Sequence, residues 1–330
     1  MIRYLIRRLL GIVVVLLLIT AVTYLIFFVL PSNPAQLSCG KPCTPDRLAN
    51  VLHFEHLDLP VYVQFWEFLV GLVAGRTFGA GTGLVHCVAP CFGYSFRLGA
   101  PVTDLIAQRF PITASIAVGA ALLWLVVGVA AGVISAVRRG SVLDRTLMVS
   151  ALAGVSAPTY LVGLLGILLF GFGLNAVPVS GYVPFFDNPL QWAWHLVLPW
   201  CVLAFVSAAV YTRLTRNQML EVLGEDYIVT ARAKGLTERR VVLRHGLRSV
   251  LAPIITVFGL DLGSLLGGAV ITESVFGMQG IGQLLIEAVH QLDLPLVVGL
   301  TVFSGFLIVL ANLVVDIAYV FLDPRVTYDQ

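Results

Sequence analysis

The feature that most constrains this chain is its set of long apolar stretches. Six segments each hold about 20 or more mostly apolar residues, approximately Leu9–Leu30, Pro111–Val137, Leu147–Phe172, Leu190–Tyr211, Val250–Val275 and Leu294–Leu322. A helix needs about 20 such residues to cross the hydrocarbon core, where every backbone polar group must be bonded within the segment. The sequence therefore predicts an all-α integral membrane protein with six transmembrane helices.

The composition agrees with a membrane location. Hydrophobic residues make up 58% of the 330 residues and charged residues only 12%, whereas about 25% are charged in soluble domains. A soluble chain of this length would need more polar surface to cover its core. The net charge is +2, and the basic residues are few and fall between apolar stretches. The composition therefore does not favour nucleic-acid binding.

The first apolar stretch follows Arg3, Arg7 and Arg8, as in a signal peptide. Its length of about 22 residues exceeds the 7–15 of a signal-peptide core. It ends in Pro31-Ser32-Asn33-Pro34 rather than in a small-x-small cleavage site. We therefore expect residues 1–30 to form a retained transmembrane helix.

The distribution of Lys and Arg predicts the orientation. Of the 20 basic residues, 15 lie in the N-terminal segment, the 138–146 turn, the 212–249 segment and the C-terminal tail. Because cytoplasmic loops carry the excess of Lys and Arg, we expect cytoplasmic N- and C-termini. Residues 31–110 then form an extracytoplasmic loop region. Residues 111–322 form a five-helix core with a cytoplasmic loop at about 212–249, and 323–330 form a cytoplasmic tail.

The 225–240 segment has the pattern of a short helix. Asp226 stands near its start, where the helix dipole favours acidic residues, and Lys234 with Gly235 forms a basic last turn and a C-cap. A short helix that lies between two membrane spans and ends at a glycine suits docking into a groove on a soluble partner.

The residues Asp226-Tyr227-Ile228-Val229-Thr230-Ala231-Arg232-Ala233-Lys234-Gly235-Leu236 resemble the coupling loop of ABC-transporter membrane subunits. The version is similar to that of the dipeptide, oligopeptide and nickel branch. Val229 stands where the general family pattern has a glutamate, and only Ala231 matches its second alanine. The resemblance implies that Asp226, Tyr227, Thr230, Ala231, Arg232, Ala233, Lys234, Gly235 and Leu236 couple the chain to an ATPase, with the small Ala231 and Ala233 allowing close approach.

The resemblance extends along nearly the whole chain. Matching stretches are Tyr4–Leu10, Leu30-Pro31, Gly93–Phe96, Ser156–Tyr160, Glu273–Phe276, Gly280–Gly282, Asn312–Asp316 and Leu322–Val326. The long first external loop resembles the B-type subunit of the pair. The resemblance implies a type I ABC importer permease fold in the bacterial plasma (inner) membrane. It also implies a homologous C-type permease, two ATP-binding subunits or domains and an extracytoplasmic substrate-binding protein as partners.

The sequence gives no sign of an enzyme. The phosphate-loop pattern Gly-x-x-x-x-Gly-Lys-Ser/Thr is absent, so ATP and Mg²⁺ are expected on partner subunits and no cofactor on this chain. The glycine-rich 277–282 run follows a membrane helix rather than a strand, which argues against a nucleotide site.

Peptides are the substrates that the resemblance favours. A nickel chelate, haem or a glycoside is an alternative within the family. An ion-driven secondary transporter would favour internal repeats, and we detect none between the two halves. A membrane enzyme would need clustered polar groups in the spans.

Four of the five cysteines lie in the predicted external region, as Cys39-x3-Cys43 and Cys87-x3-Cys91. An oxidising exterior favours disulfides, and four cysteines allow three pairings, of which the two short ones are the simplest. A metal site formed by these thiolates with His53, His56 or His86 is the alternative. Cys201 is expected to be an inert packing residue.

Ionisable residues within membrane segments are candidates for function because burying a charge in hydrocarbon is unfavourable. We assign Asp261 and Glu273 to the translocation path and expect Asp316 to be structural. Glycine and alanine recur in the second and fifth segments, which predicts close helix packing. Pro158 and Pro199 can kink their helices.

Overall fold

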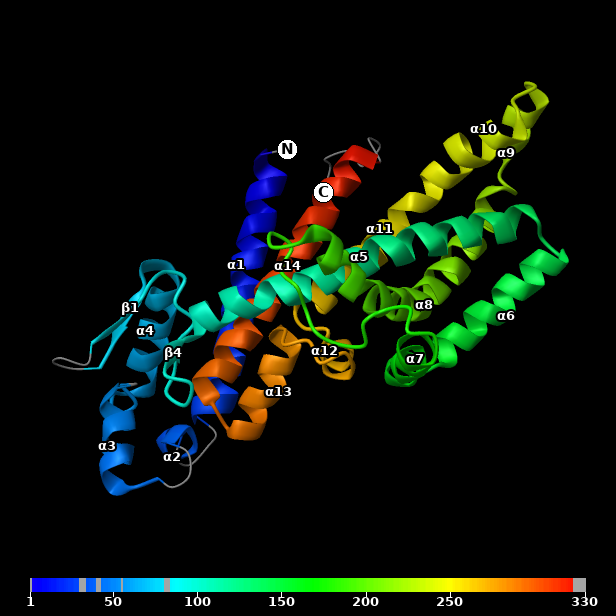
Figure 1. Cartoon of the computed structure of the whole chain (residues 1–330). Coiled ribbons are helices and arrows are strands. Elements are labelled where there is room, and N and C mark those ends of the chain that lie inside the picture. The colour runs from blue at the N-terminus through cyan, green and yellow to red at the C-terminus, as the bar shows by residue number, and fades with distance from the viewer. Residues whose placement is uncertain (1, 30–33, 40–42, 55, 80–83, 323–330) are drawn as a thin grey trace. The chain divides into compact units, whose positions relative to one another are not determined.

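The computed structural model describes residues 2–29, 34–39, 43–54, 56–79 and 84–322, which are mostly helical (Figure 1). The chain divides into two compact units. The first holds Met1–Thr113, Leu266–Val270 and Gln279–Val309, and the second holds Ala114–Leu265, Ile271–Met278 and Leu310–Gln330.

The first unit contains the N-terminal membrane helix and the segments that follow it. Its elements are α1 (Ile2–Tyr24) with its π-helical continuation η1 (Leu25–Val29), α2 (Pro34–Cys39), α3 (Pro45–Phe54), α4 (Val61–Ala74), β1 (Arg76–Phe78), β2 (Val85–Cys87), β3 (Tyr94–Ser95), β4 (Ala100–Pro101) and α13 (Ile281–Gln291). It also contains the start of α5 (Val102–Val137) and most of α14 (Leu294–Leu322).

The second unit contains the middle membrane helices and the loop between α8 and α11. Its elements are α6 (Val142–Ser156), α7 (Thr159–Gly166) with the π-helical η3 (Ile167–Gly173), α8 (Pro189–Val222), α9 (Asp226–Ala233), α10 (Glu238–Arg240), the π-helical η4 (Val241–Gly246), α11 (Leu247–Leu266) and α12 (Val270–Val275). The ends of α5 and α14 complete it.

Among the described residues, five helices are long and apolar enough to cross a membrane. They are Leu10–Val29, Val102–Val137, Pro189–Val222, Glu238–Leu266 and Leu294–Ala318. A sixth span is possible if Val142–Ser156 and Thr159–Gly173, which are bent by 104° at the break between them, form one crossing. The prediction of a helical membrane protein with up to six spans is confirmed.

Four predicted segments differ from the observed helices, and among them the fourth ends at Val222 rather than at Tyr211. The third is broken at Pro158, which caps the start of α7 and has no N–H to continue a helix; by contrast, α8 runs through Pro199. The fifth begins earlier, at Glu238, and ends at Leu266, before Gly268 with its positive φ of 143°. Glu273 therefore lies in the separate α12 and not in the span. The second begins nearer the N-terminus, at Val102.

Small residues bring membrane helices together in the second unit. A Cβ at Gly132 of α5 would lie 2.5 Å from the Cβ of Thr215 on α8, and one at Gly128 would lie 2.6 Å from the Cβ of Tyr211. Because real Cβ atoms do not approach so closely, α5 and α8 can keep this spacing only with glycine at these positions. The predicted close packing is confirmed for this pair.

The region expected to be a polar external loop has a structure of its own. Strands β1 and β2 pair antiparallel with Thr77 opposite His86, and β3 pairs antiparallel with β4. Two small apolar clusters lie here, one around Phe78 and Tyr94 and the other around Val51. The predicted loop region therefore contains two small apolar clusters of its own.

A buried carboxylate joins this region to the last membrane helix. Asp293, 2% exposed, accepts a hydrogen bond from the Ser95 hydroxyl and caps α14 by accepting the Leu296 N–H at 3.3 Å. Burial raises the pKa of the Asp293 carboxyl, while these two hydrogen bonds and the nearby Arg97 oppose the rise. The β3–β4 turn is thereby tied to the start of α14.

Candidate coupling loop

The loop between α8 and α11 forms a helical hairpin (Figure 1). After α8 ends at Val222, a short turn leads into α9, which spans Asp226–Ala233. The chain then turns at Gly235 and returns through α10 and η4 into α11. The short helix predicted in this segment is confirmed.

The C-terminus of α9 is closed by a complete hydrogen-bonded cap. Gly235 has a φ of 77°, its N–H donates to the Arg232 carbonyl at 2.9 Å, and the Leu236 N–H donates to the Ala231 carbonyl at 3.4 Å. These are the two bonds of a Schellman motif, which needs a left-handed residue at the position of Gly235. The predicted role of Gly235 as the helix terminator is confirmed.

One face of α9 packs inside the hairpin. Ile228 and Ala231 are buried with Val241 of η4, and Leu223 and Leu236 pack against them. Because Ala231 is only 8% exposed, its small size allows close packing within this chain. Ala231 therefore lies on the packed side of α9 rather than on its exposed side, and its predicted role in coupling stays a prediction.

Polar contacts fix the hairpin at two further points. The Arg232 guanidinium donates to both carboxylate oxygens of Glu238, at 3.1 and 2.7 Å, and this carboxylate raises the pKa of Arg232. The hydroxyl groups of Tyr227 and Ser249 lie 3.2 Å apart. These contacts join α9 to α10 and α11, the helical segments that return from the turn. The hairpin therefore has a defined shape.

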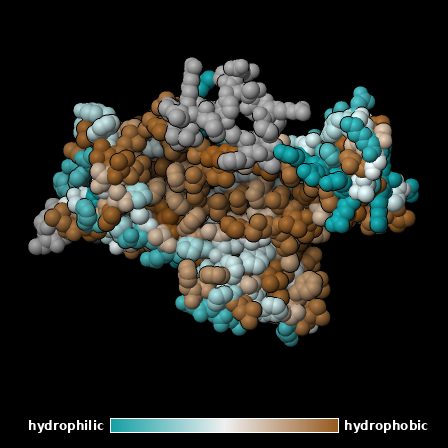
Figure 2. Space-filling model, turned by 90° about the horizontal axis from the view of Figure 1, so that it is seen from above, coloured by the Kyte–Doolittle hydropathy of each residue, from teal (hydrophilic) through white to brown (hydrophobic). Residues whose placement is uncertain are grey.

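The opposite face of α9 is exposed. Asp226, Val229, Thr230 and Ala233 lie three or four residues apart, which places them on one side of a helix, and all four are exposed. Val229 is 56% exposed although it is apolar. Hydrophilic residues gather at the end of the second unit that carries α9 and α10 (Figure 2). The exposed stripe, which we call the outer face of α9, thus combines the apolar Val229 and Ala233 with the polar Asp226 and Thr230.

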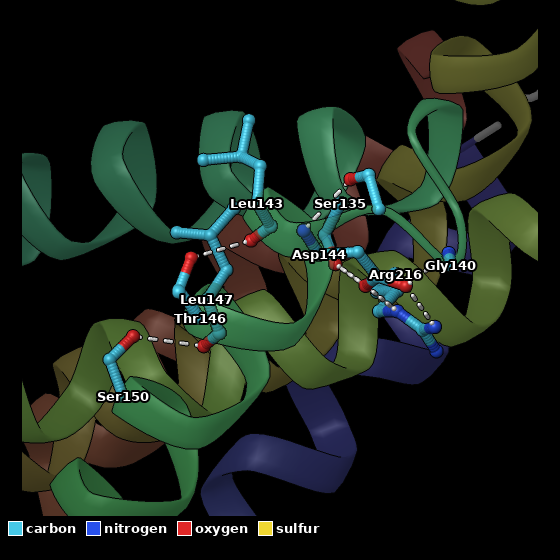
Figure 3. A network of polar contacts seen from close by, with 9 residues as sticks. Ser135, Gly140, Leu143, Asp144, Thr146, Leu147, Ser150 and Arg216 are labelled. Carbon is cyan, nitrogen blue, oxygen red and sulfur yellow. Dashed lines mark hydrogen bonds and ion pairs between the residues drawn. The ribbon is translucent and has the colours of Figure 1, made fainter.

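A second polar cluster lies where α5, α6 and α8 meet (Figure 3). Asp144 of α6 is 4% exposed and accepts from the Arg216 Nε and Nη2 atoms at 2.8 and 3.0 Å. It also accepts from the Ser135 hydroxyl and, at 2.9 Å, from the Gly140 N–H. Four donors from three parts of the chain therefore converge on one carboxylate.

The two residues assigned to a translocation path differ in burial. Asp261 on α11 is exposed and accepts a hydrogen bond from the buried Tyr211 of α8 at 2.8 Å. Glu273 on α12 is fully buried, and its backbone carbonyl accepts the Met278 N–H at 2.8 Å. Asp261 is therefore available to a passing molecule or to a partner, and Glu273 in this conformation is not.

Four cysteines of the first unit are paired in the structure as Cys39–Cys43 and Cys87–Cys91. Two of the histidines considered as metal ligands face carboxylates instead, since His53 lies 3.4 Å from Asp58 and His56 lies 2.9 Å from Glu67. Cys201 on α8 is exposed, so the expectation that it packs inside the chain was wrong.

Two family models match this chain in sequence. Residues 1–117 match the N-terminal model of binding-protein-dependent transport system membrane components, and residues 128–328 match the model of the inner membrane component itself. The chain belongs to this family. It is a multi-pass membrane permease subunit of an ABC importer.

Relatives match the permease over nearly its full length. A putative peptide transport system permease protein of Brucella abortus (strain 2308) is 38% identical over 98% of both chains. The dipeptide transport system permease protein DppB of Escherichia coli (strain K12) is 35% identical over 100% of both chains. The glutathione transport system permease protein GsiC of Escherichia coli O1:K1 / APEC is 36% identical over 99% of this chain and 100% of its own.

The fold of the permease is also found in a solved structure. The inward-facing MetNI methionine ABC transporter has a chain that matches with a TM-score of 0.52 at 20% identity, covering 67% of this chain and 97% of its own. At this identity the match establishes the fold alone, which is the type I importer permease fold expected from the sequence.

Sequence reasoning missed the Asp144–Arg216 pair of the permease. Asp144 follows the basic turn with Arg138 and Arg139, and Arg216 follows the predicted end of the fourth span. An acidic residue within a basic turn, together with an arginine one turn beyond an apolar stretch, was the available signal. Because α8 is followed after a short turn by α9, the Asp144–Arg216 pair fixes the helix from which the hairpin begins.

Proposed function

We propose that this permease is the B-type subunit of a peptide importer. It encloses the translocation path with a homologous C-type permease, while two ATP-binding subunits or domains hydrolyse ATP with Mg²⁺. A binding protein delivers di- or oligopeptides from outside. The support is that relatives named for dipeptide, peptide and glutathione transport match nearly the whole chain.

The proposed orientation places both termini in the cytoplasm. Residues 31–110 and the loop between η3 and α8 then face outward, and the α8–α11 hairpin faces the cytoplasm. The support is the excess of Lys and Arg in the N-terminal segment, the α5–α6 turn and the hairpin. Cysteine labelling tests it: Arg47→Cys and Val183→Cys should react with an impermeant reagent from outside, whereas Arg139→Cys and Lys234→Cys should not.

The proposed coupling element is the hairpin, and its outer face is the part that contacts the ATPase. The observation that carries this assignment is the division of α9 into two faces. Ile228 and Ala231 hold it against its own hairpin, and the outer face remains exposed. Because α9 is capped and packed on one side, a movement of the ATPase against its outer face would displace the whole hairpin as a rigid body.

Within the membrane, we propose that Asp261 lines the path or contacts the partner permease. It is an exposed carboxylate on a membrane helix, and such groups face a bundle interior or an aqueous cavity because lipid contact is unfavourable. Glu273 is assigned a structural role instead, since it is fully buried.

Reconstitution tests the proposed function directly. The permease should co-purify with an ATPase pair and a second permease, and peptides with the binding protein should stimulate ATP hydrolysis and uptake in proteoliposomes. A nickel chelate, haem and a glycoside serve as competing substrates. Uptake that follows an ion gradient and continues without ATP would contradict the proposal.

A further inference from the structure

Helix α4 is mostly apolar, with Gln64 and Glu67 as its only polar side chains, although it lies in the region between the first two membrane spans. Its 14 residues correspond to about 21 Å at 1.5 Å per residue, which is too short to cross a hydrocarbon core of about 30 Å. Four side chains on one side are exposed and uncharged: Tyr62 (76%), Trp66 (66%), Val70 and Val73 (83%). We call this stripe the free face of α4.

The other side of α4 packs against the first membrane helix. The Tyr24 hydroxyl donates to the Gln64 side chain at 2.9 Å, and the Tyr24 ring lies 5.5 Å from Phe65 and 6.2 Å from Phe68. Tyr24 also stacks on Phe28 at 4.6 Å. The Gln64 amide in turn donates to the Leu57 and Leu59 carbonyls, at 3.2 and 2.7 Å. The position of α4 beside α1 and η1 is therefore fixed by a hydrogen bond and a group of aromatic contacts.

Those contacts place α4 beside the end of the first candidate membrane span. Tyr24 and Phe28 belong to the span Leu10–Val29. Only 17% of the most apolar stretch of this span is buried by the rest of the chain. Its neighbours Val22, Leu25 and Ile26 are exposed, so this end of the span presents apolar side chains to its surroundings. A helix that packs on residues 24 and 28 reaches the same surroundings.

We propose that α4 lies in the membrane interface beside the end of the first span, with its free face against lipid. The occupant follows from continuity, because α4 packs on a candidate membrane-spanning helix whose neighbouring apolar side chains are exposed as well. The residue types agree with this placement, since Tyr and Trp are enriched where acyl chains meet headgroups. A 10–14-residue apolar helix is typical of such an interfacial segment.

The remaining side of α4 has a polar anchor. Glu67 accepts from the Arg76 guanidinium at 2.9 Å and lies 2.9 Å from the His56 ring nitrogen. The Glu67 side chain is 31% exposed. It lies on a different side of α4 from the free face. The helix therefore has one side for protein, one for lipid and one for the headgroup region, which fixes its rotation in the interface.

Site-specific photocrosslinking tests the proposal in the assembled transporter in its native membrane. The photoreactive residue p-benzoylphenylalanine is placed in turn at Trp66 and Val73, whose side chains are mostly exposed. The matched control is Thr77, which is also exposed and lies four residues beyond Val73. After irradiation, mass spectrometry identifies what each position has captured.

The expected result is a phospholipid adduct at positions 66 and 73, several-fold more abundant than at position 77. Capture of the partner permease or of the binding protein at both positions would overturn the proposal, because the free face would then be a protein interface. Yields at 66 and 73 no higher than at 77 would also overturn it, because the free face would then be exposed to water. Both readouts are independent of the transported substrate, so failure of the peptide assignment would not affect them.

Discussion

Asp144 of α6 and Arg216 of α8 form a two-point ion pair, with N–O distances of 2.8 and 3.0 Å. The same carboxylate accepts hydrogen bonds from the Ser135 hydroxyl at the end of α5 and from the Gly140 N–H in the turn that follows. A bidentate pair fixes the orientation of the guanidinium as well as its distance. The ends of three membrane helices are thereby joined beside the segment that leads to the hairpin.

Replacing Asp144 by alanine should destabilise the permease, because it leaves Arg216 and Ser135 without their shared acceptor. We expect the melting temperature of the purified complex to fall by several degrees. Arg145→Ala changes the adjacent, exposed residue and is the control that should leave the melting temperature nearly unchanged. A double-mutant cycle with Arg216→Ala measures the pair itself, and independent effects of the two substitutions would contradict its role.

Replacing Gly132 by leucine should force α5 and α8 apart. A Cβ at this position already lies 2.5 Å from Thr215 and 2.8 Å from the Thr212 carbonyl, and overpacking of this kind costs about 1–3 kcal/mol. Gly11→Leu is the matched control, since nothing lies within 4 Å of its added Cβ. Thermal unfolding of the two variants compares them. Equal stability of both variants would show that the α5–α8 contact is not tight.

The sequence was sufficient for the helical membrane architecture and for α9, because both depend on local patterns. Apolar length predicted the spans, and Lys234-Gly235 predicted the end of the short helix. The break at Pro158 was considered only as a kink, since a proline within a span can be accommodated, as Pro199 is in α8. The direction of the chain after such a break depends on packing with other helices.

The parts that the sequence did not predict are those set by tertiary contacts. Whether Ala231 faces inward or outward depends on Val241 and Leu236, which come from the returning part of the hairpin. The burial of Glu273 and the exposure of Cys201 likewise follow from neighbouring helices. The Asp144–Arg216 pair joins residues 72 positions apart, and no local pattern relates them.

The two disulfides of the first unit can be checked by peptide mapping without reduction. We expect Cys39–Cys43 and Cys87–Cys91 as the bonded pairs, and Cys201 to react as a free thiol once the complex is solubilised. Any bridge between the two pairs, or a stoichiometric metal ion released only when the four sulfurs are modified, would contradict this assignment. Reduction should loosen the small apolar clusters around Val51 and Tyr94, which hold these cysteines.

Two substitutions in the hairpin can distinguish a loss of coupling to the ATPase from a loss of folding. Val229→Asp places a charge on the outer face of α9, where the Val229 side chain is 56% exposed and outside the packed cluster of the hairpin. Gly235→Pro removes the N–H that closes the cap and cannot adopt a positive φ. Arg232→Ala is the control, because an exposed ion pair contributes at most about 1 kcal/mol. All three variants should reach the membrane in equal amounts.

Substrate-stimulated ATP hydrolysis and uptake in proteoliposomes of matched subunit content test the coupling account most directly. We predict that Val229→Asp and Gly235→Pro each abolish both activities, while Arg232→Ala retains most of them. Full coupled transport by the Val229→Asp and Gly235→Pro variants would contradict the account, because the α8–α11 hairpin would then be an ordinary loop.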